Sequence, residues 1–250
     1  MSETLLGRDE RIEADLRWSP VRVAGTLVLG AWAALFWFLL VSGRDAFYLS
    51  TRTEWVVPVA AGLLTLATLG RLASARSGLP EPLRSRELAV MIAMVVPVLL
   101  LTILPPATLG SFSAGKRSAV AGAGFSASAG DIATGDLTLV DVAVAQTTPE
   151  GERALAKRAG ETVTFVGFVT RYGDTPADEF LLTRYVVSCC VADATVAQVR
   201  VVNVTPGAFG DNEWVEVTGT IYPIGREVIV NAGSDGIVEV ERPERPYLSF

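Results

Sequence analysis

Three apolar segments without a charged residue lie in the first 110 residues of this 250-residue chain, and they constrain its fold more than any other feature. The segments are Val23–Val41, Trp55–Leu69 and Leu88–Leu104. A helix needs about 20 apolar residues to cross a bilayer, and helices in soluble cores are seldom apolar on every side. We therefore expect a cytoplasmic leader at residues 1–22 and three transmembrane helices within residues 23–109.

The distribution of basic residues around these segments predicts their orientation. The leader and loop 70–87 carry eight arginines, whereas loop 42–54 and the stretch after the third segment carry only four basic residues (Arg44, Arg52, Lys116 and Arg117). Short loops rich in lysine and arginine stay in the cytoplasm. The pattern predicts a multi-pass protein of the cell membrane, with a cytoplasmic N-terminus and a C-terminal part outside the cytoplasm.

The second half of the chain has the pattern of a β domain. Residues 110–135 are rich in Gly, Ala and Ser, which is typical of a flexible linker, and residues 136–250 follow as a separate domain. Within it, residues 149–159 resemble a short polar helix, and residues 137–145 are too short to classify. Six β-rich segments follow: Thr162–Arg171, Glu179–Val187, Ala197–Val204, Glu213–Tyr222, Glu227–Asn231 and Ile237–Glu241. This spacing predicts an all-β domain with an OB-like barrel, and an open β-sandwich is the alternative.

Composition narrows the range of functions. The chain has no histidine, which is the usual general base near neutral pH and the commonest metal ligand. The net charge is +1 over residues 1–110 and −7 over residues 111–250. A domain this acidic lacks the positive field that attracts nucleic acids. We expect no enzymatic activity, no catalytic residues and no nucleic-acid partner.

Both cysteines are adjacent, at Cys189 and Cys190, and Asp193 follows three residues later. Three interpretations remain open. The thiols could pack as small apolar side chains, or they could close a strained vicinal disulfide. They could also bind a ligand together with Asp193, including a metal ion such as zinc. No cofactor is otherwise expected.

Three neighbouring side chains complete the set of candidate residues. Arg184 would either form a salt bridge with a carboxylate such as Asp193 or orient an anionic ligand through two parallel hydrogen bonds. Trp214 is expected in the core, with a position at the rim of a partner interface as its alternative. Tyr185 is a second candidate for that interface.

Several motifs resemble those of the YcgQ-like family of bacterial permease-subunit proteins. They are Phe165-Val-Gly-Phe-Val169, Leu182-Thr-Arg-Tyr185, Cys189-Cys190-x-Ala192-Asp193 and Trp214-Val-x-Val-Thr-Gly-Thr220. Tyr48-Leu49 and Leu104-Pro-Pro-x-x-Leu-Gly-Ser111 in the membrane half are similar too. The resemblance implies membrane spans, an outer domain of unknown function and a multi-spanning permease as partner. It carries no catalytic residues.

Together these observations predict an accessory, non-conducting subunit of a bacterial permease complex. Its extracytoplasmic domain would bind or present a ligand or partner. The alternative is a membrane-anchored thiol/disulfide or metal-binding envelope protein that acts without a permease.

Overall fold

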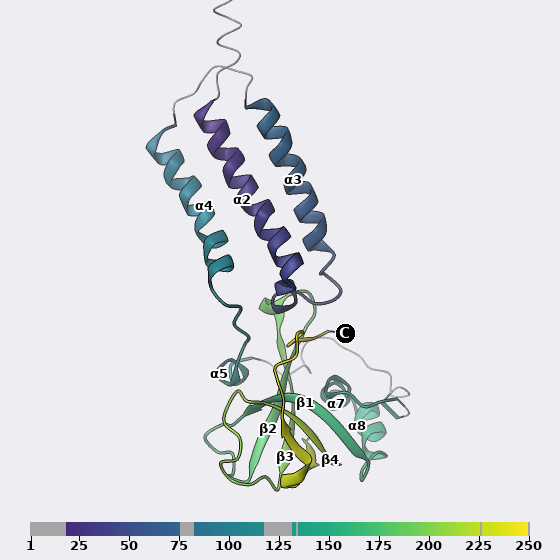
Figure 1. The fold of residues 1–250 in the computed structure, drawn as a ribbon. Helices are drawn as coiled ribbons and strands as arrows, with labels where there is room; N and C mark the ends of the chain where they lie inside the picture. The colour runs from purple at the N-terminus through teal and green to yellow at the C-terminus, as the bar shows by residue number, and fades with distance from the viewer. Residues whose placement is uncertain (1–18, 76–82, 118–131, 134, 226, 250) are drawn as a thin grey trace, which may run out of the picture. The chain divides into compact units, whose positions relative to one another are not determined.

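The computed structural model describes residues 19–75, 83–117, 132–133, 135–225 and 227–249 (Figure 1). The chain divides into two compact units. The first comprises Met1–Asp45 and Glu54–Pro106, and the second comprises Ala46–Thr53 and Ala107–Phe250. The connection between the first two long helices therefore belongs to the C-terminal unit, which the sequence did not lead us to expect. Of the predicted leader at residues 1–22, residues 1–18 lie outside the described residues.

The first unit contains three long helices, α2 (Pro20–Ser42), α3 (Val56–Ser74) and α4 (Ser85–Ile103). Local sequence explains both ends of α2. Pro20 occupies the first turn, where its missing N–H leaves no hydrogen bond unmade. Gly43 ends the helix with a φ of 66°, a left-handed conformation that glycine adopts without strain. All three helices are long and apolar enough to cross a membrane, as the sequence predicts.

These helices expose apolar side chains on most of their surface. Within the most hydrophobic 18-residue window of each helix, 17% of α2, 11% of α3 and only 6% of α4 is buried. Val98 is the one residue of α4 that is buried. Such surfaces are unfavourable in water, and they suggest that this unit associates with a membrane.

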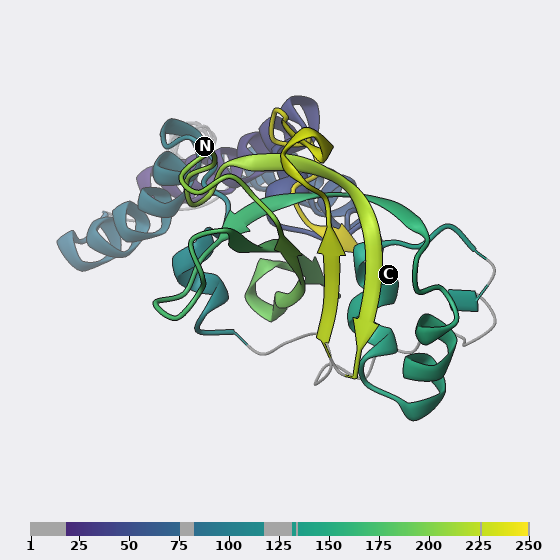
Figure 2. The ribbon, with the colours of Figure 1, turned by 90° about the horizontal axis from the view of Figure 1, so that it is seen from below.

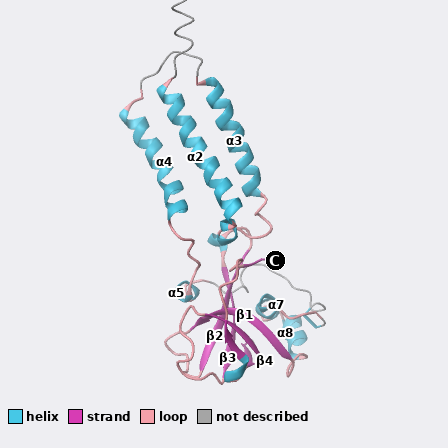
Figure 3. Ribbon diagram, in the orientation of Figure 1, coloured by secondary structure: helices cyan, strands magenta, loops and turns pink. Residues whose placement is uncertain are grey.

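The second unit is built on a mixed sheet of seven strands, shown in magenta in Figure 3. The strands are β1 (Thr162–Thr170), β2 (Glu179–Val187), β3 (Thr195–Val202), β4 (Trp214–Ile224), β5 (Glu227–Asn231), β6 (Ile237–Glu239) and β7 (Leu248–Ser249). β3 pairs with β5 in parallel, as β7 does with β2, and the remaining pairs are antiparallel. The pairings β1–β2, β2–β3, β3–β5, β5–β4 and β4–β1 return to the starting strand.

The predicted strands are present, with bounds that agree within two residues, and β2 and β5 have the predicted bounds. The predicted all-β domain is correct for the sheet but omits helices that pack against it. The sheet is mixed, since two of its strand pairs are parallel. The OB-like barrel stays a prediction.

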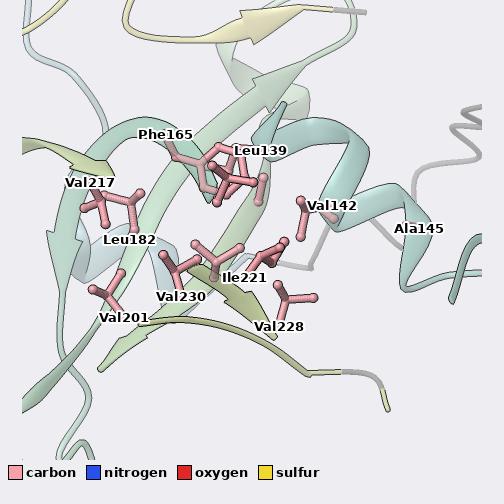
Figure 4. Close-up of a cluster of buried hydrophobic side chains, with 14 of the residues drawn as sticks. Leu139, Val142, Ala145, Phe165, Leu182, Val201, Val217, Ile221, Val228 and Val230 are labelled. Atoms are coloured by element: carbon pink, nitrogen blue, oxygen red, sulfur yellow. The ribbon is translucent and has the colours of Figure 1, made fainter. Parts of the chain in front are cut away.

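A valine-rich core lies between this sheet and two short helices, α7 (Leu139–Ala145) and α8 (Pro149–Ala156). Figure 4 shows Leu139 and Val142 of α7 pointing toward Phe165, Leu182 and other side chains of the strands. Figure 2, seen from below, shows α7 and α8 side by side. The segment 137–145, too short to classify from its sequence, is thus a helix whose apolar residues complete the core.

A cap starts α7. The Thr138 hydroxyl accepts a hydrogen bond from the Asp141 N–H at 3.2 Å, and the Thr138 N–H donates to the Asp141 carboxylate at 3.0 Å. This reciprocal pair satisfies two N–H groups at the end of the helix. Of the predicted linker 110–135, residues 111–114 form the short helix α5 (Ser111–Ala114), while residues 118–131 lie outside the described residues.

Candidate functional site

The turn after β2 contains both cysteines, and Asp193 organises it. The Asp193 carboxylate accepts hydrogen bonds from the backbone N–H groups of Ser188, at 3.0 Å, and Cys189, at 2.8 Å. The Asp193 N–H donates in turn to the Cys190 carbonyl at 3.0 Å, within the short helix η3 (Val191–Asp193). The two N–H groups lie five and four residues before Asp193, so this one side chain closes the turn through local bonds to the backbone.

The two thiols face each other across this turn. Both are free, and their sulfur atoms lie 3.6 Å apart. Cys189 is exposed and Cys190 is half-buried, so neither thiol belongs to the buried core. The interpretation in which both cysteines pack as small apolar side chains does not explain why Cys189 is exposed.

Hydrogen bonding also shifts the pKa values of Cys189 and Asp193. The pKa of Cys189 is raised to about 11, first because its thiol donates to the Asp193 carboxylate and then because of the contact with Cys190. For Asp193, partial burial is the largest single effect and raises the pKa. The hydrogen bonds from the Cys189 thiol and the turn N–H groups together outweigh burial, and the pKa of Asp193 lies below its ordinary value.

These shifts limit the chemistry of the site. A thiol with a pKa of about 11 is almost entirely protonated near pH 7, and only the thiolate is a strong nucleophile or metal ligand. Within the described residues, no group of three or more His, Cys, Asp or Glu side chains could hold a metal ion. Near pH 7 the Cys189 thiol is therefore suited to donating a hydrogen bond rather than to rapid nucleophilic attack.

Residues 48–53, far away in the sequence, form hydrogen bonds with the backbone of the turn. The Ser50 N–H and the Thr53 hydroxyl both donate to the Cys189 carbonyl, at 3.1 and 2.5 Å. The buried Ser50 hydroxyl donates to the Ser188 carbonyl at 2.7 Å. The Val191 N–H donates to the Tyr48 carbonyl at 2.8 Å. We call this set of contacts between residues 48–53 and residues 188–191 the loop clasp.

Sequence reasoning missed the residues of the clasp. Ser50 and Thr53 are separated from the turn by more than 130 residues and contribute through single hydroxyl and backbone groups. No periodicity or spacing in the sequence marks such a pairing. The only signal is the resemblance of Tyr48-Leu49 to a family motif, which does not indicate a contact.

No salt bridge between Arg184 and Asp193 is found within the described residues. The Arg184 guanidinium donates instead to three backbone carbonyls, those of Pro246 at 3.1 Å, Val166 at 3.3 Å and Arg245 at 2.8 Å. Burial lowers the pKa of Arg184. Five donors on one planar group can satisfy several carbonyls at once, and Arg184 uses them to fasten the C-terminal segment to β1 and β2.

Trp214 and Tyr185 meet in a second cluster, away from the thiols. Phe168 contacts both, with ring centroids 5.6 Å from Tyr185 and 5.7 Å from Trp214. Tyr185 is buried and its hydroxyl donates to the Gly110 carbonyl at 2.7 Å, so its surroundings within the chain leave no exposed face for a partner. Trp214 is half-buried, and the Arg184 guanidinium lies 5.3 Å from its ring.

The structure thus divides the candidate residues into two places. Cys189, Cys190 and Asp193 come together in the turn, as their spacing predicts. Arg184, Tyr185 and Trp214 lie elsewhere. Arg184 binds the C-terminal segment at residues 245–246 and lies over the Trp214 ring, and Tyr185 binds Gly110. Burial of Tyr185 raises its pKa to about 12, so it stays protonated at any physiological pH.

Comparison with known proteins bears on the C-terminal half. Residues 133–248 match the family model described as the DUF1980 C-terminal domain, a span of less than half the chain that includes the cysteine turn and strands β1 to β6. Comparisons with curated proteins and with solved structures find no match. Residues 133–248 are therefore similar to the DUF1980 C-terminal domain, and the match says nothing of the residues before 133.

Proposed function

We propose that this protein is an accessory, non-conducting subunit of a bacterial membrane permease complex. Its C-terminal domain would bind or present a ligand or partner outside the cytoplasm. The observation that carries the proposal is the surface of α4. Only 6% of its hydrophobic window is buried, although α2 lies beside it. Lipid could cover this surface, but a neighbouring membrane protein would give it a specific role.

A shallow apolar groove on this surface suits a partner helix. It has a volume of about 320 Å³ and is lined by Val28 of α2 and by Met91, Ile92, Val95, Val96 and Leu99 of α4. Membrane helices associate through close packing rather than through hydrophobicity alone. A groove between two helices offers such packing to a transmembrane helix of the permease.

The helices are poorly suited to conduction on their own. The apolar segments 23–41, 55–69 and 88–104 contain no ionisable side chain, and intramembrane charges usually mark ion or substrate pathways. The resemblance to YcgQ-like proteins supports a multi-spanning permease as the partner that supplies the pathway. The excess of basic residues in the leader and loop 70–87 supports a C-terminal domain outside the cytoplasm.

The strand order favours an OB-like barrel for the C-terminal domain. Five strands whose pairings return to the first strand are what a small closed barrel requires, and barrels of this kind use one face and its loops to bind ligands. The fold by itself does not identify the ligand.

Affinity purification of the full chain from membranes tests the proposal. In mild detergent, a multi-spanning membrane protein should co-purify in a fixed ratio. Val96→Trp fills the groove and should reduce recovery of the partner. Leu63→Trp, at an exposed position of α3, is the matched control and should not. If no membrane protein accompanies the chain at stoichiometric levels, the proposal is wrong.

A second candidate is a thiol/disulfide or metal-binding protein that acts alone. The 3.6 Å separation of the sulfur atoms favours it, whereas the raised pKa of Cys189 opposes catalysis of disulfide exchange. Catalysed reduction of a disulfide substrate, abolished by Cys190→Ser, or a stoichiometric metal in the purified protein would favour this candidate over the first.

A further inference from the structure

The peptide bond between the two cysteines has a second role in the structure. Its carbonyl, that of Cys189, accepts hydrogen bonds from the Ser50 N–H at 3.1 Å and the Thr53 hydroxyl at 2.5 Å. The group that joins the two thiols is therefore also the group that holds residues 48–53 in the loop clasp. Residues 48–53 connect α2 to α3 along the chain.

We propose that Cys189 and Cys190 form a redox modification site, at which closure of a vicinal disulfide releases the loop clasp. The site would sense an oxidant of the disulfide class rather than catalyse turnover. The inference does not depend on a permease partner, and either can fail without the other.

Geometry links ring closure to the clasp. A disulfide bond is about 2.05 Å long, so the sulfur atoms must approach from 3.6 Å. Adjacent Cα atoms lie about 3.8 Å apart across a trans peptide, below the 4.4–6.8 Å range of ordinary disulfides. Cys190 is extended in the reduced protein, with φ −157° and ψ 168°. In this proposal, closing the ring rotates the intervening peptide and turns the Cys189 carbonyl away from Ser50 and Thr53.

Access and reversibility are consistent with a modification site. Cys189 is exposed, so an external disulfide can reach its sulfur. Strain in the small ring makes the product easy to reduce. The hydrogen bond between the Cys189 thiol and Asp193 keeps this thiol protonated, which protects the reduced state from unselective oxidation.

The reaction balances with an external disulfide as oxidant. One cysteine loses its proton and attacks the external disulfide, which forms a mixed disulfide and releases one thiol. The second cysteine then attacks the protein sulfur of the mixed disulfide, closes the ring and releases the second thiol. The protein loses two electrons and two protons, and the two released thiols carry these electrons and protons.

Hydrogen exchange of the purified full chain in detergent tests the proposal, with oxidised glutathione as the oxidant. Intact mass should fall by two hydrogen atoms, without a bound glutathione. The Ser50 and Val191 amides, which donate within the clasp, should then exchange about tenfold faster. The Val142 amide, which donates to Thr138 in α7, should not change.

Two variants serve as controls. Cys190→Ser cannot close the ring, so the oxidant should leave its Ser50 exchange unchanged. Thr53→Val removes one hydrogen bond to the Cys189 carbonyl and should speed Ser50 exchange in the reduced protein. The proposal is overturned if both thiols survive the oxidant, if only glutathione adducts or intermolecular disulfides form, or if the ring closes and Ser50 exchange stays the same.

Discussion

The Asp193 carboxylate accepts a hydrogen bond from the backbone N–H of Cys189 at 2.8 Å and also raises the pKa of the Cys189 thiol. One acidic side chain therefore shapes the turn and controls the reactivity of the cysteine that begins it. This relationship explains why the exposed Cys189 thiol stays protonated near pH 7, and it is open to direct tests by substitution.

Asp193→Asn should lower the pKa of the Cys189 thiol from about 11 toward its ordinary value of 9.0, because the negative charge that retains the proton is gone. The rate of alkylation as a function of pH measures this pKa. Asp174→Asn, an exposed carboxylate in the β1–β2 loop, is the control and should leave the profile unchanged. An unaltered profile for Asp193→Asn would refute the assigned cause.

The same substitution predicts a pH dependence of stability. Because the pKa of Asp193 is lowered in the folded chain, its contribution is fully present above the ordinary carboxyl pKa of 3.8 and is lost as pH falls through the lower, folded value. The free energy of unfolding of the native chain should exceed that of Asp193→Asn at pH 7, and the difference should vanish in strong acid. Pulse proteolysis across this pH range measures it, and a difference that grows with acid would contradict the sign.

Gly167→Ala should destabilise the sheet by about 1–3 kcal/mol, because overpacking forces backbone movement. A Cβ at this position would lie 2.7 Å from the Thr183 carbonyl oxygen and 3.0 Å from Leu182. Gly173→Ala is the matched control, since nothing lies within 4 Å of its added Cβ. Urea unfolding compares the two variants, and equal midpoints would show that the strands can separate at no cost.

Tyr185→Phe should lower stability by about 1 kcal/mol, since it removes the hydroxyl that donates to the Gly110 carbonyl at 2.7 Å. Tyr222→Phe, at a side chain that is 42% exposed, should have little effect. Thermal unfolding of the detergent-solubilised protein measures both. A loss as large for Tyr222→Phe would assign the effect to something other than the buried hydrogen bond.

Arg184→Lys should loosen the C-terminal segment, because an ammonium group cannot reproduce the fork that reaches three separate carbonyls. Amide exchange should rise over residues 247–249, where β7 pairs with Val186 and Val187 of β2. The control Arg153→Lys changes an exposed arginine of α8. Unchanged exchange for Arg184→Lys would mean that β7 is held by its strand pairing alone.

Much of the fold can be predicted because its signals are local. Uninterrupted apolar runs predict α2, α3 and α4. Alternation at Val215, Val217 and Ile221 predicts β4, and these three side chains are all buried. The turn is predicted as a site because Cys189, Cys190 and Asp193 are close in sequence. These features depend on neighbouring residues, and neighbouring residues are what a sequence shows.

The remaining features depend on contacts that leave no local pattern. Ser50 meets the cysteine turn through backbone and hydroxyl groups that any sequence could supply. Arg184 prefers backbone carbonyls to a carboxylate, and carbonyls are invisible in a sequence. Leu139–Ala145 is only seven residues long, too short for helical periodicity, and its cap at Thr138 is the clearer signal.

Photocrosslinking from α4 in living cells tests the proposed role most directly. A photoreactive residue replaces Leu99, which is 51% exposed, and in a second variant it replaces Val98, which is 6% exposed. The account predicts a discrete adduct with a multi-spanning membrane protein from position 99 and not from position 98. Adducts with lipid alone at position 99, with the protein at its normal abundance, would contradict the assignment as a permease subunit.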